Sequence, residues 1–268
     1  MEYPLVMGIL NATPDSFYAG SRMQTEKEIA RRTNQIVEEG GTIIDVGACS
    51  TRPDSDAVSE EEELSRARKA LAVVRQQQPD AIVSIDTFRP AVARMAVEEF
   101  GVGIINDVQS TAVTHPSTYP PPGGRGACFD LPMFKEAGRL QVPYVLTSLE
   151  PAVNPMLLRW AHEVEQLREA GVKDIILDPG FGFGKTLEEN YTLMNELEKL
   201  KVMNLPLLVG VSRKSMIYKL LGITPDEALG GSTVLHTIAL MKGASILRVH
   251  DVKDCIQALK IVSHVSKI

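Results

Sequence analysis

The amino-acid sequence predicts one α/β domain, a (β/α)8 barrel of the TIM-barrel type that spans residues 1–268. Three observations support this prediction. Eight short apolar runs recur along the chain, with starts roughly 34 residues apart, which is enough for a strand, a crossover helix and two loops. Amphipathic segments with helix-start signals lie between these runs. The chain has 268 residues, close to the length of about 250 that such a barrel commonly uses.

The predicted strands are apolar on both alternations, which is typical of parallel strands that are covered on both faces. In chain order they are Leu5 to Leu10, Ile43 to Val46, Ala81 to Ile85, Gly103 to Ile105, Pro143 to Leu146, Asp174 to Leu177, Pro206 to Val211 and Ser245 to Val249. Each run is too short for a helix.

Helix starts are predicted from capping signals between the strands. The capping-box spacing occurs at Thr25 with Glu28, Ser59 with Glu62 and Thr186 with Glu189, and Thr224 is followed by a proline suited to the first helical position. An open doubly wound sheet is the alternative architecture. It would require a Gly-x-Gly-x-x-Gly sequence after the first strand, which this chain lacks.

Charge and cysteine usage exclude several classes of function. The formal net charge is −6, and no long run of Lys or Arg is present, so nucleic acid is not expected as a partner. Three widely separated cysteines show neither disulfide-framework nor zinc spacing, which favours a reducing cytoplasm. No apolar stretch approaches the length of a membrane span or resembles a signal peptide.

One segment departs from the strand and helix rhythm. From Gln109 to Phe129 the sequence is rich in Pro, Gly, Ser and Thr and has no periodicity. It predicts a long, mobile loop after the fourth strand.

Seven of the predicted strands end in polar residues, and in a barrel these ends meet on the face where active sites lie. Four of these polar residues, on central strands, can hydrogen-bond the N–H groups of a fused heterocycle: Asp45, Asp86, Asn106 and Asp178. Four cationic or potentially cationic residues lie nearby and suit a phosphate or diphosphate: Arg52, Lys214, Arg248 and His250. The set therefore predicts a site for a heterocycle that carries an anionic leaving group.

Structural roles remain open for several of these residues. Asp45 is equally compatible with a ligand contact and a structural role, and Asp107 and Asp251 fit helix N-caps better than ligands. His250 could bind a ligand or a backbone carbonyl. Cys49 has no base beside it and is not expected to be a nucleophile.

The glycine-rich segment after the sixth strand is not a P-loop, because Pro179 stands where the first glycine of that motif is required. Its glycines are expected to let the backbone approach a ligand closely. Phe181 and Phe183 offer either a ring for stacking or a core anchor.

Seven sequence blocks together carry a family resemblance. In order they are MGILNATPDSF, IIDVGACSTRP, SIDTF, INDV, ILDPGFGFGKT, LLVGVSRKSMI and ILRVHDV. The set spans almost the whole chain and closely resembles the dihydropteroate synthases of the folate pathway. Two alternatives remain: a non-catalytic pterin-binding relative, and a barrel similar to the folate-dependent methyltransferases.

The resemblance implies condensation of 6-hydroxymethyl-7,8-dihydropterin diphosphate with 4-aminobenzoate, in the presence of Mg²⁺ and in a homodimer. It implies Lys214, Arg248 and Arg52 as catalytic residues. The implied pterin contacts are Asp86, Asn106, Asp178, Lys214 and Arg248. The implied diphosphate contacts are Asn11, Thr51, Arg52, Arg248 and His250, with Asn11 also at the metal. The implied 4-aminobenzoate contacts are Thr51, Pro53, Phe181, Ser212 and Lys214.

The chain departs from the family pattern at two adjacent parts of the barrel rim. After the fifth strand it reads Val145-Leu146-Thr147-Ser148, where the family has a Met-His-Met-x-Gly turn, and the Pro/Gly-rich stretch replaces the family loop after strand four. CSTRP also stands where the family commonly has ESTRP. These changes predict an altered wall of the pterin site.

Overall fold

The computed structural model describes residues 4–12, 25–49, 58–108 and 132–265. Thr51, Arg52, Pro53 and the Gln109 to Phe129 segment, for which the sequence makes predictions, lie outside these residues.

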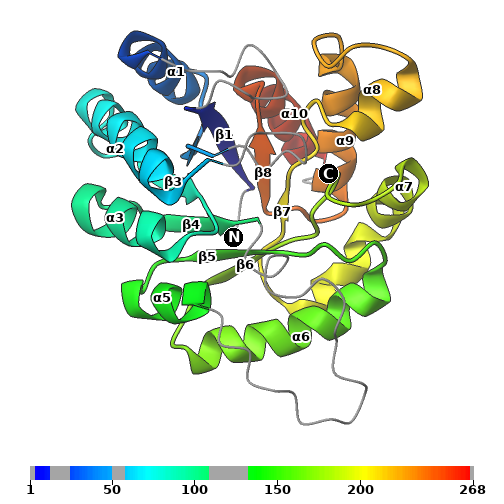
Figure 1. Ribbon diagram of the computed structural model, residues 1–268. Helices are drawn as coiled ribbons and strands as arrows, with labels where there is room; N and C mark the ends of the chain where they lie inside the picture. Colours follow the sequence, from blue (N-terminus) through cyan, green and yellow to red (C-terminus); the bar gives the residue numbers. More distant parts are fainter. Residues whose placement is uncertain (1–3, 13–24, 50–57, 109–131, 266–268) are drawn as a thin grey trace.

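Eight parallel strands form one sheet in the order β6-β5-β4-β3-β2-β1-β8-β7. They are β1 (Leu5–Asn11), β2 (Ile43–Gly47), β3 (Ile82–Asp86), β4 (Ile104–Asp107), β5 (Tyr144–Thr147), β6 (Ile175–Asp178), β7 (Leu208–Val209) and β8 (Ile246–Val249). The outer strands β6 and β7 meet at one bridge, between Leu177 and Leu207, so the barrel is nearly closed (Figure 1). The predicted (β/α)8 architecture is confirmed.

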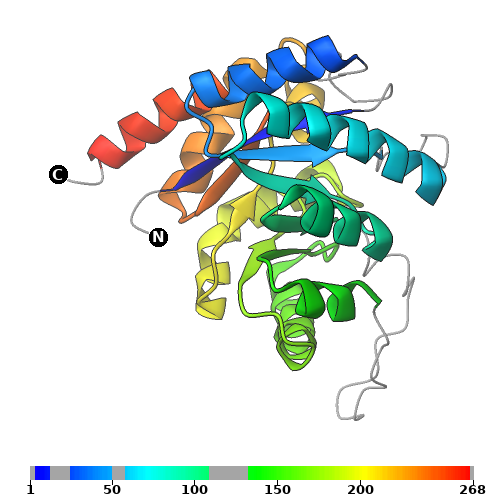
Figure 2. The ribbon, with the colours of Figure 1, turned by 90° about the vertical axis from the view of Figure 1, so that its left-hand side faces the viewer.

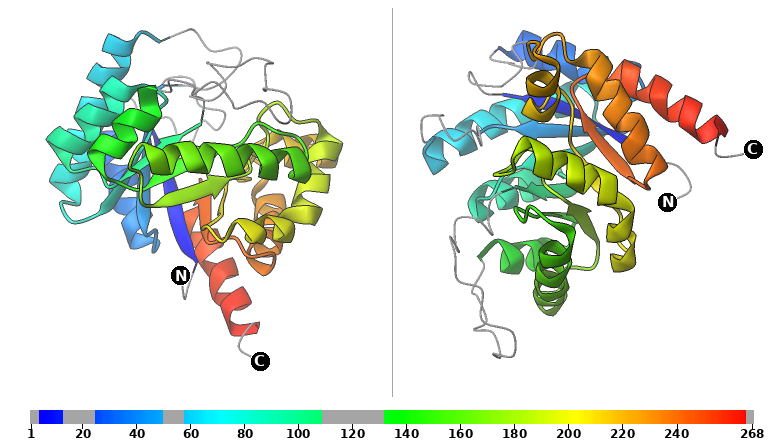
Figure 3. Two further views of the ribbon diagram at one scale, coloured as in Figure 1. Left: turned by 90° about the horizontal axis from the view of Figure 1, so that it is seen from below. Right: turned by 90° about the vertical axis from the view of Figure 1, so that its right-hand side faces the viewer.

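Helices surround this sheet on its outer side, as the views from the side and from below show (Figures 2 and 3). They are α1 (Glu26–Glu38), α2 (Glu60–Gln77), α3 (Pro90–Phe100), α5 (Pro132–Leu140), α6 (Val153–Glu169), α7 (Leu187–Glu196), the 3-10 helix η2 (Leu197–Met203), α8 (Ser215–Leu221), α9 (Leu229–Met241) and α10 (Val252–Val265). Among the described residues, none of these helices has the length and apolar character needed to cross a membrane.

The capping signals identify three helix starts correctly. Thr25 and Thr186 each form a complete capping box with the glutamate three residues later. Ser59 accepts a hydrogen bond from the Glu62 backbone N–H at 3.2 Å and begins α2. These bonds satisfy N–H groups that have no partner within the helix.

The predicted helix start at Thr224 is wrong by one turn. The chain forms successive tight turns after Thr224, and α9 begins only at Leu229. The carbonyls of Pro225 and Asp226 accept hydrogen bonds from the Arg213 guanidinium at 2.8 and 2.6 Å. These contacts from a distant residue hold the segment in a turn despite its helix-start signal.

Side chains inside the barrel are arranged in two layers. The lower layer is apolar and consists of Met7, Ile43, Ile104, Val145, Ile176, Leu208 and Ile246. Side chains two residues apart on a strand share a face. The next inward positions are therefore Ile9, Asp45, Asn106, Thr147, Asp178, Gly210 and Arg248. Because most of these are polar, the interior changes from apolar to polar toward the carboxyl ends of the strands.

The alternate positions of the same strands face the helices and form the main core. They include Ile44, Val46, Ile105, Leu146 and Leu177, all buried in one cluster with the inner faces of the surrounding helices. Burying both faces explains why each strand is apolar on both alternations, apart from its last inward residue.

Candidate active site

Arg248 links two of the predicted acidic residues at the mouth of the barrel. Its Nε atom donates to Oδ2 of Asp45 at 2.7 Å, and its Nη2 atom donates to Oδ2 of Asp86 at 2.7 Å. Burial opposes the charge of the guanidinium, but the Asp45 and Asp86 carboxylates raise the pKa of Arg248 above its ordinary value. Arg248 is therefore a permanent cation held between two carboxylates.

The pKa of Asp86 is displaced upward from its ordinary value. Burial raises the pKa of Asp86 to about 7, and the Arg248 guanidinium opposes that rise. The nearby Asp45 carboxylate adds to the rise because two like charges disfavour each other's ionised form.

Asn106 also contacts the Asp45 carboxylate that binds Arg248. Its Nδ2 atom lies 3.2 Å from Oδ2 and 3.4 Å from Oδ1 of Asp45. Its Oδ1 atom is buried and has no hydrogen-bond partner among the described residues. An unpartnered buried acceptor in the polar layer is the type of atom that a ligand N–H group would satisfy.

Asp178 and Lys214 form the opposite side of the mouth. Asp178 is buried and accepts a hydrogen bond from the Gly180 N–H at 2.8 Å, and burial raises its pKa. Burial lowers the pKa of Lys214 to about 8, while the Asp178 carboxylate opposes that change. Lys214 donates to the backbone carbonyl of Phe181, and its Nζ lies 4.4 Å from the centroid of the Phe183 ring.

The two phenylalanines after β6 have different roles. The Phe181 side chain is completely buried in the core, so at Lys214 it contributes its backbone carbonyl. The ring beneath the Lys214 cation belongs instead to Phe183. Phe181 is therefore the core anchor of the two, and stacking of the Phe183 ring on a ligand stays a prediction.

Lys185 is a residue whose role the sequence analysis missed. Its Nζ donates to the carbonyl of Gly180 at 2.9 Å and lies 3.4 Å from that of Ser148. Gly180 has a φ of +67°, and a Cβ atom there would lie 2.0 Å from the Ser148 oxygen. The loop after β6 therefore packs directly on the altered segment after β5, and Lys185 joins them. The sequence around Lys185, Gly-Lys-Thr, contains no pattern that would predict its contacts with these two carbonyls.

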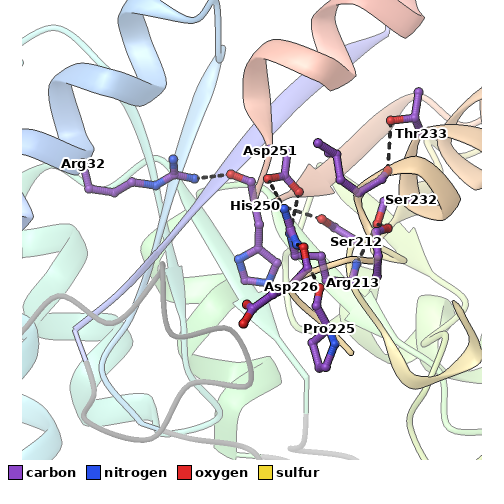
Figure 4. A network of polar contacts seen from close by, with 11 residues as sticks. Arg32, Ser212, Arg213, Pro225, Asp226, Ser232, Thr233, His250 and Asp251 are labelled. Atoms are coloured by element: carbon purple, nitrogen blue, oxygen red, sulfur yellow. Dashed lines mark hydrogen bonds and ion pairs between the residues drawn. The ribbon is translucent and has the colours of Figure 1, made fainter. Parts of the chain in front are cut away.

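Ser212, Arg213 and His250 belong to a polar network at the ends of β7 and β8 (Figure 4). The His250 N–H donates to Ser212 Oγ at 3.2 Å, and the His250 carbonyl accepts from Nη2 of Arg32, on α1, at 2.6 Å. Burial, together with Arg248 and other nearby cations, lowers the pKa of His250 well below its ordinary value. His250 is therefore neutral and can offer a hydrogen bond to an anion, but no charge.

The structure also gives contacts for the other residues whose roles the sequence left open. Asp45 faces Arg248 and Asn106, not a helix N-terminus. Asp107 faces outward and accepts from the Tyr144 hydroxyl, and Asp251 binds Arg213 at 2.8 and 2.9 Å. Burial raises the pKa of the Cys49 thiol, which disfavours its thiolate form.

Asn11, at the end of β1, also lies at the mouth. Its Oδ1 atom is 3.2 Å from the position that a Cβ atom on Gly47 would occupy, and Asp86 borders the same position. Most predicted site residues that the structure describes therefore meet around one end of the barrel, although they come from seven different strands or strand ends. These features define a (β/α)8-barrel enzyme with its active site at the carboxyl ends of the strands.

Comparisons with known proteins identify the family. A model of the family described as pterin binding enzyme matches residues 7–250. The chain is 38% identical to the dihydropteroate synthase of Escherichia coli (strain K12) over 264 residues, or 98% of this chain and 92% of that relative.

Solved structures of the same enzyme superpose closely on the chain. Yersinia pestis dihydropteroate synthase in complex with a sulfonamide drug gives a TM-score of 0.85 at 35% identity, covering 99% of this chain and 94% of that one. The Xanthomonas albilineans enzyme with 4-aminobenzoic acid gives 0.82 at 35% identity, with the same coverage. The chain belongs to the pterin-binding enzymes and, among them, to the dihydropteroate synthases.

Proposed function

We propose that this chain, residues 1–268 acting as one domain, condenses 6-hydroxymethyl-7,8-dihydropterin diphosphate with 4-aminobenzoate to give 7,8-dihydropteroate and diphosphate. One observation above all supports the proposal. Asp86, Asn106 and Asp178 lie around one mouth of the barrel, together with the cations Lys214 and Arg248. Acceptors for a flat heterocycle thus lie beside cations for its charged substituent.

Binding of the pterin is assigned to the polar layer. Asp86, Asn106 and Asp178 offer acceptor oxygens to the N–H groups of the ring, and Lys214 offers a donor to its carbonyl. Arg248 would lie against the face of the ring, because a guanidinium stacks well on flat π systems.

Loss of diphosphate is assigned to the cationic side of the mouth. The bond from the exocyclic methylene carbon to the diphosphate oxygen breaks, and the electron pair leaves with the diphosphate. Arg248 and Arg52 stabilise the charge on the leaving group, and Asn11, Thr51 and His250 contribute hydrogen bonds. The electron-rich dihydropterin stabilises the cation that develops on the methylene carbon.

The second substrate then attacks that carbon. The amino nitrogen of 4-aminobenzoate forms the new C–N bond and loses a proton to solvent, so no strong base is needed. Thr51, Pro53, Ser212, Lys214 and the Phe181 backbone are proposed to border this substrate. Sulfonamides, as arylamine mimics, are expected to compete for the same position.

The protein oxygens at the mouth can bind Mg²⁺ only if the substrate supplies further oxygen ligands. Mg²⁺ commonly uses one or two protein oxygens together with phosphate oxygens. The Asn11 amide oxygen is such a donor, and the described residues hold no cluster of three or more His, Cys, Asp or Glu side chains able to bind a metal ion. We propose that Asn11 and the diphosphate hold Mg²⁺ together, and that the ion neutralises charge on the leaving group.

Assembly and location are also proposed. Exposed apolar side chains on α8, α9 and α10, such as Leu220, Val234 and Ile261, support a homodimer. A cytoplasmic location is proposed from the sequence, whose three cysteines show neither disulfide-framework nor zinc spacing.

The test of the function is diphosphate release with and without 4-aminobenzoate. The wild-type chain should release diphosphate only when both organic substrates are present. Arg248→Ala and Asp86→Ala should each lower kcat/KM by at least roughly 10²- to 10³-fold, because Arg248 supplies charge to the leaving group and Asp86 supplies an acceptor to the pterin ring. Circular dichroism should show both variants folded, with Arg248→Ala less stable because it leaves Asp45 buried without its charged partner. Pterin binding without release by the wild type would indicate a non-catalytic relative, and near-normal rates in either variant would contradict the site assignment.

A further inference from the structure

We propose that Asp45 is a positioning residue of the pterin site, whose single carboxylate sets both the direction of the Arg248 guanidinium and the orientation of the Asn106 amide. This inference rests on the proposed function, because it concerns the same pterin-binding layer. Asp45 itself is not expected to touch the substrate.

Burial restricts Asp45 to this indirect role. Its side chain is completely inaccessible to solvent at the middle of β2, one inward position above the apolar layer of the barrel. A carboxylate in such a place is costly unless it is paired and hydrogen-bonded. Arg248 supplies the charge and Asn106 supplies a further N–H donor. The register neighbours Ile9 and Ser84 bring no charge.

The pairing decides which end of the Asn106 amide faces the ligand. A carboxylate bound to an arginine can only accept hydrogen bonds, so it selects Nδ2 of Asn106 as its neighbour. The opposite orientation would place the amide oxygen against a negative charge. Asn106 must therefore present Oδ1, the buried atom that lacks a partner in the described chain, to the ligand. A pterin edge that offers N–H groups needs an acceptor of this kind.

The Asp45 carboxylate also holds Arg248 in place when the pterin binds. Two nitrogens of Arg248 are engaged, Nε with Asp45 and Nη2 with Asp86. When a pterin N–H group takes the acceptor oxygen of Asp86, the contact to Nη2 is weakened. The contact between Nε and the fully buried Asp45 persists, so the guanidinium remains at the mouth.

Asp45→Asn tests both effects. An asparagine at position 45 can donate to position 106, which allows the Asn106 amide to turn and present its N–H groups to the ligand. We expect the dissociation constant of 6-hydroxymethyl-7,8-dihydropterin, measured by calorimetry, to rise at least about tenfold, the loss typical of one buried hydrogen bond of about 1.4 kcal/mol. The KM for 4-aminobenzoate should stay within about twofold.

A second variant distinguishes the effect of Asp45 on the orientation of the group at position 106 from a general loss of protein stability. In Asp45→Asn/Asn106→Asp the carboxylate and the amide exchange places, so position 106 can again only accept. This double variant should bind the pterin more tightly than Asp45→Asn alone. Its kcat, like that of Asp45→Asn, should lie below the wild-type value because Arg248 has lost its charged partner at position 45. Ser84→Ala is the matched control, since Ser84 is as fully buried as its register neighbour Asp45 but carries no charge that could hold Arg248.

The possible outcomes distinguish this inference from the function on which it rests. Wild-type affinity for the pterin in Asp45→Asn, or a double variant that binds no better than the single one, would overturn the positioning role. A wild-type chain that binds the pterin but never releases diphosphate would overturn the synthase activity only. The binding comparison among the variants would then still decide the role of Asp45.

Discussion

Two titratable residues at the mouth have pKa values displaced toward each other. Burial raises the pKa of Asp86 to about 7 and lowers that of Lys214 to about 8, because it disfavours the charged form of each. A residue near its pKa at working pH can change protonation when a ligand binds. The same burial that creates the site therefore makes it sensitive to pH.

This displacement predicts a narrow pH optimum. The pterin needs an ionised Asp86 as acceptor, so kcat/KM for the pterin diphosphate should rise as the pH passes about 7. The site also needs a protonated Lys214, so the rate should fall as the pH passes about 8. Steady-state rates across this range measure both limbs. His250 adds no limb, because its pKa lies well below the range.

Lys214→Arg separates the two limbs. Arginine keeps its charge throughout the range, so the descending limb should disappear while the ascending limb remains. A profile that still falls above pH 8 in this variant would show that another group titrates there.

At the scale of elements, the segment between β7 and α8 depends on one side chain. Arg213 has a φ of +54°, in the left-handed region that is costly for a residue with a side chain. Its guanidinium binds both oxygens of Asp251 and the carbonyls of Pro225 and Asp226, and its N–H donates to Ser232 Oγ (Figure 4). These contacts compensate the strain and join three separate segments beside Ser212 and Lys214.

Arg213→Ala should therefore destabilise the protein strongly. It leaves Asp251 without its bidentate partner in a largely buried place, and losses of about 3–5 kcal/mol are typical of breaking such a pair from one side. Chemical unfolding measures this change. Arg68→Ala is a matched control, since Arg68 also binds a carboxylate, that of Glu99, but at an exposed position, and its loss should be much smaller. Equal effects in the two variants would show that the network around Arg213 does not brace the fold.

The elements themselves were largely predictable from the sequence, and the errors have identifiable causes. Every predicted apolar run contains a strand, and several strands extend one residue further, to Asn11, Asp86, Thr147 and Asp178. Hydrogen bonds of the sheet involve only the backbone, so a polar side chain can end a strand when it points into the mouth. The start of α9 was misplaced because the Arg213 contacts that hold the turn come from far away in sequence.

The candidate site was predictable as a set of polar strand ends, but the pairing within it was not. Asp45 remained ambiguous because its partner Arg248 lies 203 positions away, and only the assembled barrel brings the two side chains together. Lys185 was missed for the same reason, since its carbonyl partner at Ser148 lies 37 positions away. Spacing along a strand indicates which side chains share a face, whereas contacts between distant strands depend on how the barrel closes.

At the scale of the whole molecule, apolar side chains remain exposed on two neighbouring helices. Val234 and Met241 are seven residues apart on α9, and Ile261 and Val265 are four apart on α10, so each pair lies along one face of its helix. The two helices pack side by side next to β8 (Figure 1). Exposed apolar side chains on neighbouring helices are unfavourable in water, and burial against a second copy would remove them from water.

The proposed homodimer makes Met241 and Leu158 a matched pair of test sites. Both side chains are highly exposed, at 70% and 73%, but Met241 lies on α9, whereas Leu158 lies on α6, away from α9 and α10 (Figure 1). Light scattering should give twice the mass of one chain for the wild type. Met241→Glu should give the monomer mass, because a charge buried at an apolar interface is strongly unfavourable. Leu158→Glu should remain dimeric, and a dimer that is lost only in this second variant would place the interface on α6 instead.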